Sequence, residues 1–129
     1  MEVPMSNDFP LFLQWLDFLK WLLSTTEKFP KRVRFTFSDR INNLALSVVE
    51  DLVEARYTAH KLSGLKKINL TLEKIRILLR IAYETQILPT QAYEQAMKSL
   101  NEMGKMLGGW IKQQQPGRNS KHAQAEPFV

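Results

Sequence analysis

Cationic side chains gather at three places in the sequence where they could hold an anion. The first group, the basic cluster, surrounds a Phe29-Pro30 break and consists of Lys28, Lys31, Arg32 and Arg34. Lys66 and Lys67 are adjacent, and Arg76 and Arg80 are four residues apart. Lysine and arginine neutralise phosphates, and the planar guanidinium donates two hydrogen bonds to one phosphate. These residue types indicate phosphate binding, as on a nucleic-acid backbone.

The positions of these cations within the expected helices are unusual. The basic cluster lies where a helix is expected to begin after Pro30, and Lys66 and Lys67 lie in the expected first turn of the next helix. A helix N-terminus carries partial positive charge and favours acidic residues. Either local carboxylates such as Glu27 and Asp39 offset the cations, or the cations and the free backbone N–H groups bind an anion together.

Residues able to perform catalysis are sparse. His60 and His122 are the only histidines, no Gly-rich phosphate loop occurs, and cysteine is absent. Glu50, Asp51 and Glu54 could suggest a metal, but a di-metal bundle site needs Glu-x-x-His motifs on facing helices, and the sequence has none. We therefore expect no catalytic residue, no metal site and no cofactor, and we interpret these carboxylates as a solvated face.

Composition predicts one folded domain with an anionic partner. The chain has 129 residues, of which 44% are hydrophobic and 24% charged, as in globular proteins. The net charge of +5 favours an anionic partner weakly. The longest apolar stretch, residues 11–23, contains Gln14, Asp17 and Lys20, so we expect no membrane span. With no secretion signal visible, the expected location is the cytoplasm.

Hydrophobic periodicity and breaks predict four helices and no strands. The expected helices cover residues 10–28, residues 31–61, residues 65–86 and residues 90–114, with Thr90 as the cap of the last helix and Ser63-Gly64 as a turn. Connections this short favour antiparallel neighbours. The sequence thus predicts an all-α, up-down-up-down four-helix bundle over residues 10–114. Residues 1–9 form an N-terminal extension, and residues 115–129 are expected to be disordered.

Two of the expected helices carry a second apolar stripe besides the one that faces the core. On the second helix this extra stripe consists of Phe35, Leu46, Val49, Val53 and Tyr57. On the third helix it consists of Leu70, Ile77 and Ile81. A monomeric bundle has only one interior, and aligned extra stripes would expose a large apolar patch. We interpret both stripes as a homo-oligomer interface. The alternative is scattered apolar surface residues, which are normal.

The predicted topology relates two groups of cations. The start of the second helix and the end of the third lie at the same end of the bundle, so Arg76 and Arg80 are expected to approach the basic cluster. In the alternative interpretation the two arginines pair with Glu73 and Glu84 on a solvated face.

Two segments resemble a known protein family. Residues 26–57 contain an FPK break, a basic run and the ending DLVEARY, and residues 78–112 begin LLRIAYETQILPTQAYEQ. Both are similar to the accessory variability determinant proteins of diversity-generating retroelements, over about residues 11–112. A looser resemblance extends to the four-helix-bundle proteins encoded in rRNA intervening sequences.

The resemblance implies a non-enzymatic accessory protein. Such proteins form ring-like homopentamers, bind RNA and DNA, and associate with the reverse transcriptase of the same retroelement to support mutagenic cDNA synthesis. The positions that match the family's basic pattern are Lys31, Arg32, Arg34, Arg40, Arg56, Arg76 and Arg80; Lys66 and Lys67 complete the nucleic-acid-binding set. The alternative is a structural protein of the rRNA intervening-sequence type with no reverse-transcriptase partner.

Overall fold

The computed structural model describes residues 8–115, which form four α-helices and no strand. The helices are α1 (Asp8–Thr26), α2 (Asp39–Arg56), α3 (Leu62–Glu84) and α4 (Thr90–Gln113), with two short helical turns, η1 (Lys31–Val33) and η2 (Arg34–Ser38), before α2. The predicted all-α, four-helix fold is confirmed. Most of the predicted N-terminal extension and nearly all of the predicted disordered tail lie outside the described residues. No helix in the described range is long and apolar enough to cross a membrane.

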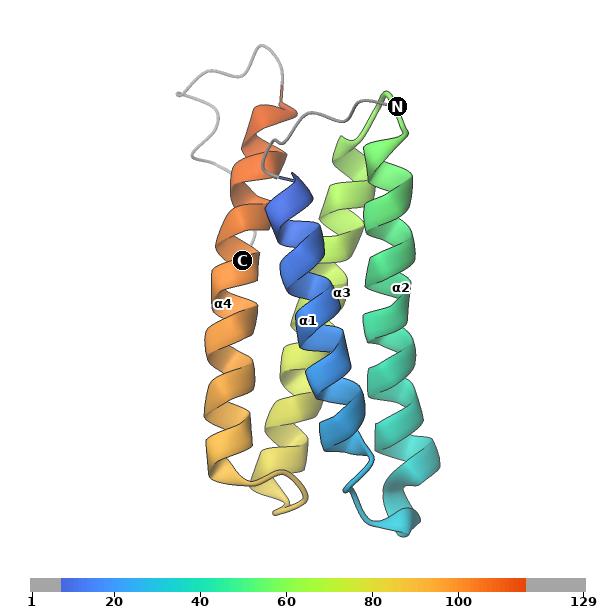
Figure 1. Cartoon of the computed structure of the whole chain (residues 1–129), viewed down its shortest axis with the longest axis vertical. Coiled ribbons are helices and arrows are strands. Elements are labelled where there is room, and N and C mark those ends of the chain that lie inside the picture. Colours follow the sequence, from blue (N-terminus) through green and yellow to red (C-terminus); the bar gives the residue numbers. More distant parts are fainter. Residues whose placement is uncertain (1–7, 116–129) are drawn as a thin grey trace.

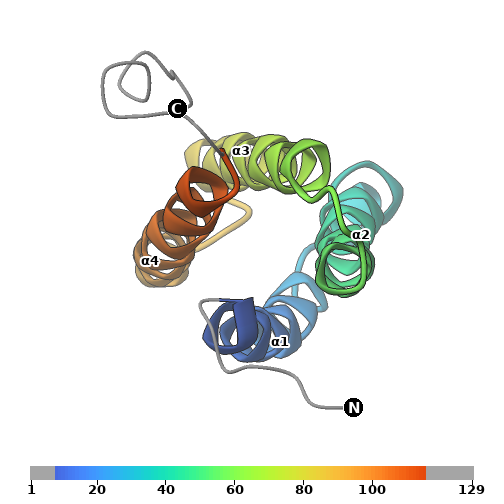
Figure 2. The ribbon, with the colours of Figure 1, turned by 90° about the horizontal axis from the view of Figure 1, so that it is seen from above.

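The four helices surround one core. Each helix packs against the next along the chain, and α1 also packs against α4. Figure 2 shows this arrangement from above, and Figure 1 shows the connections of α1 to α2 and of α3 to α4 at one end, with the connection of α2 to α3 at the other. We call the end that holds η1 and η2 the foot of the bundle.

The core is filled by the apolar faces expected from the periodicity. On α3 the apolar residues that recur at helical spacing opposite the predicted extra stripe are all buried: Ile68, Leu72, Ile75, Leu79 and Ala82. Trp15 of α1 is also buried, and its indole Nε1 donates a 3.0 Å hydrogen bond to the carbonyl oxygen of Ala45. A buried tryptophan needs such a partner for its N–H group, and here the partner fixes α1 against α2.

The foot of the bundle departs from the prediction of one helix from residue 31 to residue 61. A 3-10 turn and a π-turn precede α2. Val33 and Ser38, five residues apart, are both buried, because one turn of π-helix brings residues at that spacing to the same side. Ser38 Oγ then donates to the carbonyl oxygen of Thr26, and Thr26 Oγ1 donates to Asn42 Oδ1, so both side chains join the end of α1 to the start of α2.

The connection between α2 and α3 corrects two further predictions. α2 ends at Arg56 instead of residue 61, because Lys61 Nζ donates to the carbonyl oxygens of Ala55, Arg56 and Thr58 and so satisfies the free end of the helix. α3 begins at Leu62, so the predicted Ser63-Gly64 turn is wrong: both residues belong to the first helical turn. Lys66 and Lys67 consequently lie in the second turn of α3.

A left-handed residue ends α3 two residues earlier than predicted. Gln86 has φ 64°, Ile87 N donates to the carbonyl oxygen of Ala82 at 2.8 Å, and Gln86 N donates to that of Tyr83 at 3.0 Å. This pair of bonds is a Schellman motif, in which glycine is the usual left-handed residue. Thr90 begins α4, but its side chain makes no capping hydrogen bond, so the predicted cap is wrong.

Candidate nucleic-acid and subunit interfaces

The foot of the bundle carries exposed cations without ion-pair partners. The basic cluster and Arg40 are all exposed. The described part of the chain contains three ion pairs, and none of them involves these residues. Glu27 and Asp39 are the only carboxylates between residues 27 and 40, against five cations. The local surplus of positive charge is therefore not neutralised within residues 8–115.

Arg76 does not approach the basic cluster, contrary to the prediction. Its side chain is 26% exposed; Nη1 donates to Asn101 Oδ1 at 2.8 Å and Nη2 donates to the carbonyl oxygen of Leu100 at 3.2 Å. Both partners belong to α4, whereas the basic cluster precedes α2 on the other side of α3. Gly104 leaves room for this contact, since a Cβ there would lie 3.1 Å from Arg76 Nη2 and the guanidinium would have to shift slightly.

The alternative interpretation of the two arginines, pairing with local glutamates, is confirmed. Arg76 Nε lies 3.8 Å from Glu73 Oε2, and Arg80 Nε lies 3.0 Å from Glu84 Oε2. The hydrogen bond to Glu84 and its charge raise the pKa of Arg80. Arg80 remains exposed, and exposed pairs are weak enough for an anion to compete with the glutamate. Phosphate contacts of Arg76 and Arg80 stay predictions.

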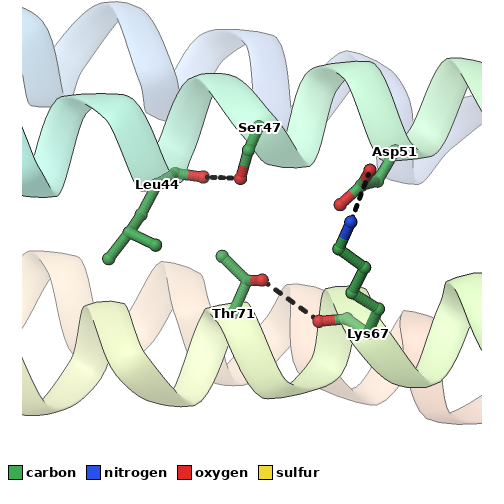
Figure 3. Close-up of polar contacts among 5 residues, drawn as sticks. All are labelled: Leu44, Ser47, Asp51, Lys67 and Thr71. Carbon is green, nitrogen blue, oxygen red and sulfur yellow. Dashed lines mark hydrogen bonds and ion pairs between the residues drawn. The ribbon is translucent and has the colours of Figure 1, made fainter.

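Lys67 pairs with Asp51 across the seam between α2 and α3. Lys67 Nζ lies 3.7 Å from Asp51 Oδ1, as Figure 3 shows, and the ammonium remains largely exposed. The carboxylate is only 11% exposed, and its Oδ2 has no hydrogen-bond partner in the structure. Ser47 and Thr71, also drawn there, donate to carbonyl oxygens of their own helices. The contact of Lys67 with Asp51 lies toward the end of the bundle opposite the basic cluster.

Arg56 is held among aromatic side chains. Its guanidinium carbon lies 5.3 Å from the ring centroid of Phe9, a cation–π contact that joins α2 to α1. Arg56 Nε is buried without a hydrogen-bond partner in the structure. A depression of about 190 Å³ beside it is lined by Phe12, Leu52, Val53, Arg56, Tyr57 and Trp110. Arg56 therefore contributes to the packing of α1 against α2.

Sequence reasoning missed one row of cations. Lys98, Lys105 and Lys112 are exposed on α4 and recur every seven residues, which places them on one face of the helix. Glu94 and Glu102 are exposed on the same helix, so this row carries a smaller surplus of positive charge than the foot. The seven-residue spacing was the signal that could have identified it.

The residues of the two extra apolar stripes are exposed, with one exception. Phe35, Leu46, Val53, Tyr57, Leu70, Ile77 and Ile81 are exposed large hydrophobics, whereas Val49 is half-buried against the core. Leu13 and Leu23 of α1 are exposed too and were not part of the predicted stripes. That the exposed stripe residues form a subunit interface stays a prediction.

The apolar stripes form two separate faces instead of one aligned patch. Val53 lines a depression together with Phe12 of α1, and Leu23 of α1 lines another with Asn42 of α2. The seam face, Leu23, Leu46, Val49 and Val53, therefore lies between α1 and α2. The outer face, Leu70, Ile77 and Ile81, lies opposite the core side of α3. The polar contact of Asp51 with Lys67 separates the two faces.

Metal-binding side chains do not cluster within the part of the chain that the structure describes. Among residues 8–115, no three His, Cys, Asp or Glu side chains gather as a metal ion would require. His60 lines a shallow depression with Asp51 and Glu54 beside the α2–α3 connection. The surfaces that stand out are therefore charged and apolar ones, suited to binding.

Comparison with known proteins gives one match. The family model described as bAvd-like matches residues 12–114, which include all four helices except the first residues of α1. Neither the comparison with curated proteins nor the one with solved structures gives a match.

Proposed function

The chain belongs to the bAvd-like family of accessory variability determinant proteins, and on this basis we propose that it is the accessory protein of a diversity-generating retroelement. In this proposal it binds RNA and DNA, binds the reverse transcriptase of the same retroelement, and supports mutagenic cDNA synthesis. It acts in the cytoplasm, without catalytic activity or a cofactor of its own.

The observation that carries the nucleic-acid part is the set of unpaired cations at the foot. The basic cluster and Arg40 face solvent with only Glu27 and Asp39 nearby in the sequence. Exposed cations at one end of a bundle can each neutralise a phosphate and release its counterion, which yields binding that depends on salt more than on sequence. The exposed Arg80, in the last turns of α3, lies toward the foot and extends the proposed surface. Lys66 and Lys67, near the start of α3, are proposed as a separate phosphate contact at the opposite end of the bundle.

The two apolar faces support a closed ring of identical subunits. Each subunit is proposed to be an up-down-up-down bundle whose seam face contacts the outer face of its neighbour. Because these faces differ, the contact is head-to-tail, and a head-to-tail contact closes into a ring when its rotation allows. A pentamer is the stoichiometry that family membership favours. Such a ring repeats the basic foot in every subunit and multiplies its field.

The proposal includes no catalytic activity of this chain, and the side chains around its histidines support that part. The two histidines are far apart in the sequence. The depression beside His60 also holds the hydroxyl groups of Thr58 and Ser63. The Thr58 hydroxyl donates to the carbonyl oxygen of Glu54, and in the described structure neither hydroxyl is hydrogen-bonded to His60 as a nucleophile would be to its base. The reverse transcriptase would supply the chemistry, and this chain would hold template and enzyme together. A structural protein of the rRNA intervening-sequence type is the alternative function.

The deciding experiment measures RNA and DNA binding by the purified protein at several salt concentrations. We expect binding at low ionic strength that weakens steeply as salt rises. The variant K31E/R32E/R34E should lose most of the affinity, and its log–log salt slope on single strands should be shallower by about 2, because three phosphate contacts are lost. The variant K98E/K105E/K112E is the matched control, since it makes the same charge change on α4.

Two results would count against the proposal. Absence of nucleic-acid binding at low salt would remove its central part, and equal losses in both triple variants would show that only total charge matters. Co-purification with the reverse transcriptase encoded beside the gene distinguishes the retroelement function from the rRNA alternative, which has no such partner.

A further inference from the structure

Phe35 is an exposed aromatic ring within a basic surface. It is 78% exposed, the highest fraction among the large hydrophobic side chains of the described residues. Arg34 precedes it directly, and Lys31, Arg32 and Arg40 of the same foot are exposed as well. Leaving a phenylalanine in water forgoes the free energy of its burial, so such a ring is expected to have a partner.

Local geometry sets Phe35 apart from both apolar faces. The next exposed apolar residue along α2 is Leu46, eleven residues later, or about 16 Å at the helical rise. The exposed side chains between them are all polar: Thr36, Asp39, Arg40 and Asn43. Leu23 of the seam face shares a depression with Arg34 and Asp39 at the foot, but Phe35 does not line that depression. Phe35, predicted from the sequence as part of the oligomer interface, is therefore set apart from the seam face.

The turn that carries Phe35 is itself unusual. η2 is a π-helical turn from Arg34 to Ser38, with Ser38 buried and Phe37 half-buried against the core. π-turns are rare, and they occur frequently at functional sites. Here the wide turn places Phe35 and Arg34 in solvent, while Ser38 is held by the carbonyl oxygen of Thr26. The Phe35 ring therefore projects from a turn that the hydrogen bond of Ser38 fixes to the end of α1.

We propose that Phe35 is a stacking platform for an unpaired base of single-stranded RNA or DNA. The inference rests on the proposed nucleic-acid binding and deepens it by naming the strand type. The phosphates on either side of the base bind Lys31, Arg32 and Arg34, and the base lies on the phenylalanine ring. Bases inside a duplex are already stacked on each other, so Phe35 favours single strands.

A membrane surface is the other anionic partner that a phenylalanine among cations could serve. Peripheral membrane helices insert a broad apolar face, with several large side chains together. Phe35 is a lone ring whose exposed neighbours are charged or polar. A single ring suits one base better than a lipid surface, and the charge of the cluster complements a phosphate backbone.

The test compares binding of a single-stranded RNA oligonucleotide with that of a hairpin duplex of the same length. F35L keeps an apolar side chain without the ring and should weaken single-strand binding about tenfold while changing duplex affinity less than twofold. F35W should restore single-strand affinity. L13A is the control: it shortens another exposed apolar side chain, on α1 and outside both apolar faces, and should leave the ratio of the two affinities unchanged.

Several outcomes would overturn the inference. The inference is wrong if F35L binds the single strand as tightly as the parent, or if it loses equal affinity for the single strand and the duplex. It is also wrong if F35L has a smaller particle mass than the parent, which would place Phe35 in a subunit contact, or if F35L selectively loses binding to anionic phospholipid vesicles. If the parent protein binds neither ligand, the proposed function itself fails. If the parent binds both and F35L matches it on both, only the stacking platform is wrong.

Discussion

Arg76 Nη1 donates a 2.8 Å hydrogen bond to Asn101 Oδ1 and so joins the middle of α3 to the middle of α4. Nη2 of the same guanidinium donates to the carbonyl oxygen of Leu100, in the space that Gly104 leaves free. The sequence pattern predicted that Arg76 binds phosphate. In the structure its half-buried guanidinium instead stabilises the fold through charge-assisted hydrogen bonds.

Replacing Arg76 with methionine should destabilise the bundle. R76M keeps the apolar stem but removes both interhelical hydrogen bonds, and the expected loss in the free energy of unfolding is about 1–3 kcal/mol. Thermal or urea unfolding followed by circular dichroism measures it. N101A in both backgrounds completes a double-mutant cycle, in which a coupling near zero would show that the Arg76–Asn101 contact contributes nothing.

Reversing the charge of Arg80 should affect binding without affecting the fold. Arg80 is exposed, and its ion pair within the described residues is with Glu84 of the same helix. R80E should therefore lower the free energy of unfolding only slightly, through repulsion between two glutamates four residues apart, but bind RNA more weakly. The raised pKa of Arg80 lies far above neutrality, so its guanidinium loses its charge only as pH rises through that pKa. The contribution of Arg80 to RNA affinity should therefore not change between pH 6 and pH 9. RNA affinity equal to that of the parent would exclude Arg80 from the interface.

The sequence was sufficient for the fold because helix faces follow from local periodicity. Ile68, Leu72 and Ile75 recur at helical spacing, and all three are buried on the core side of α3, as residues at that spacing share one face. The errors in the helix ends occurred where a side chain outside the helix, and not the pattern within it, contacts the last turn. α2 ends at Arg56 because Lys61 caps its carbonyl oxygens, and a lysine five residues past a helix gives no periodic signal.

The candidate surfaces could be predicted only in part for a related reason. Exposure of Leu70 and Ile77 follows from their position opposite the core residues of α3. The direction of Arg76 depends instead on Asn101, 25 residues away, and on the absence of a side chain at Gly104. Such tertiary contacts leave no trace in the spacing of residues along one helix.

Substituting Gln86 with glycine should stabilise the bundle. Gln86 occupies the left-handed position of the Schellman motif at φ 64°, where a side chain is strained and glycine is not. We expect Q86G to raise the free energy of unfolding by about 0.5–1 kcal/mol, seen as a higher Tm. Q91G is the matched control: it places glycine in the first turn of α4 and should lower Tm. A Q86G protein less stable than its parent would show that the Gln86 side chain makes a contribution larger than the strain.

A charged residue on either apolar face should break the proposed ring. Two such variants, studied alone and mixed, distinguish a head-to-tail contact from a two-fold contact. I77D places a carboxylate on the outer face and L46D places one on the seam face; both side chains are exposed in the subunit, so both variants should fold. In a head-to-tail contact each variant keeps one intact face. Each should therefore be monomeric alone, because an assembly needs both faces.

Mixed in equal amounts, the two variants should form a 1:1 dimer and nothing larger. The intact seam face of I77D binds the intact outer face of L46D, while the remaining two faces both carry the added charge and cannot extend the assembly. Native mass spectrometry or light scattering gives the masses. If the faces instead bound their own kind in two-fold contacts, I77D alone would dimerise through its seam face and L46D alone through its outer face. A dimer of either single variant would therefore exclude the head-to-tail ring.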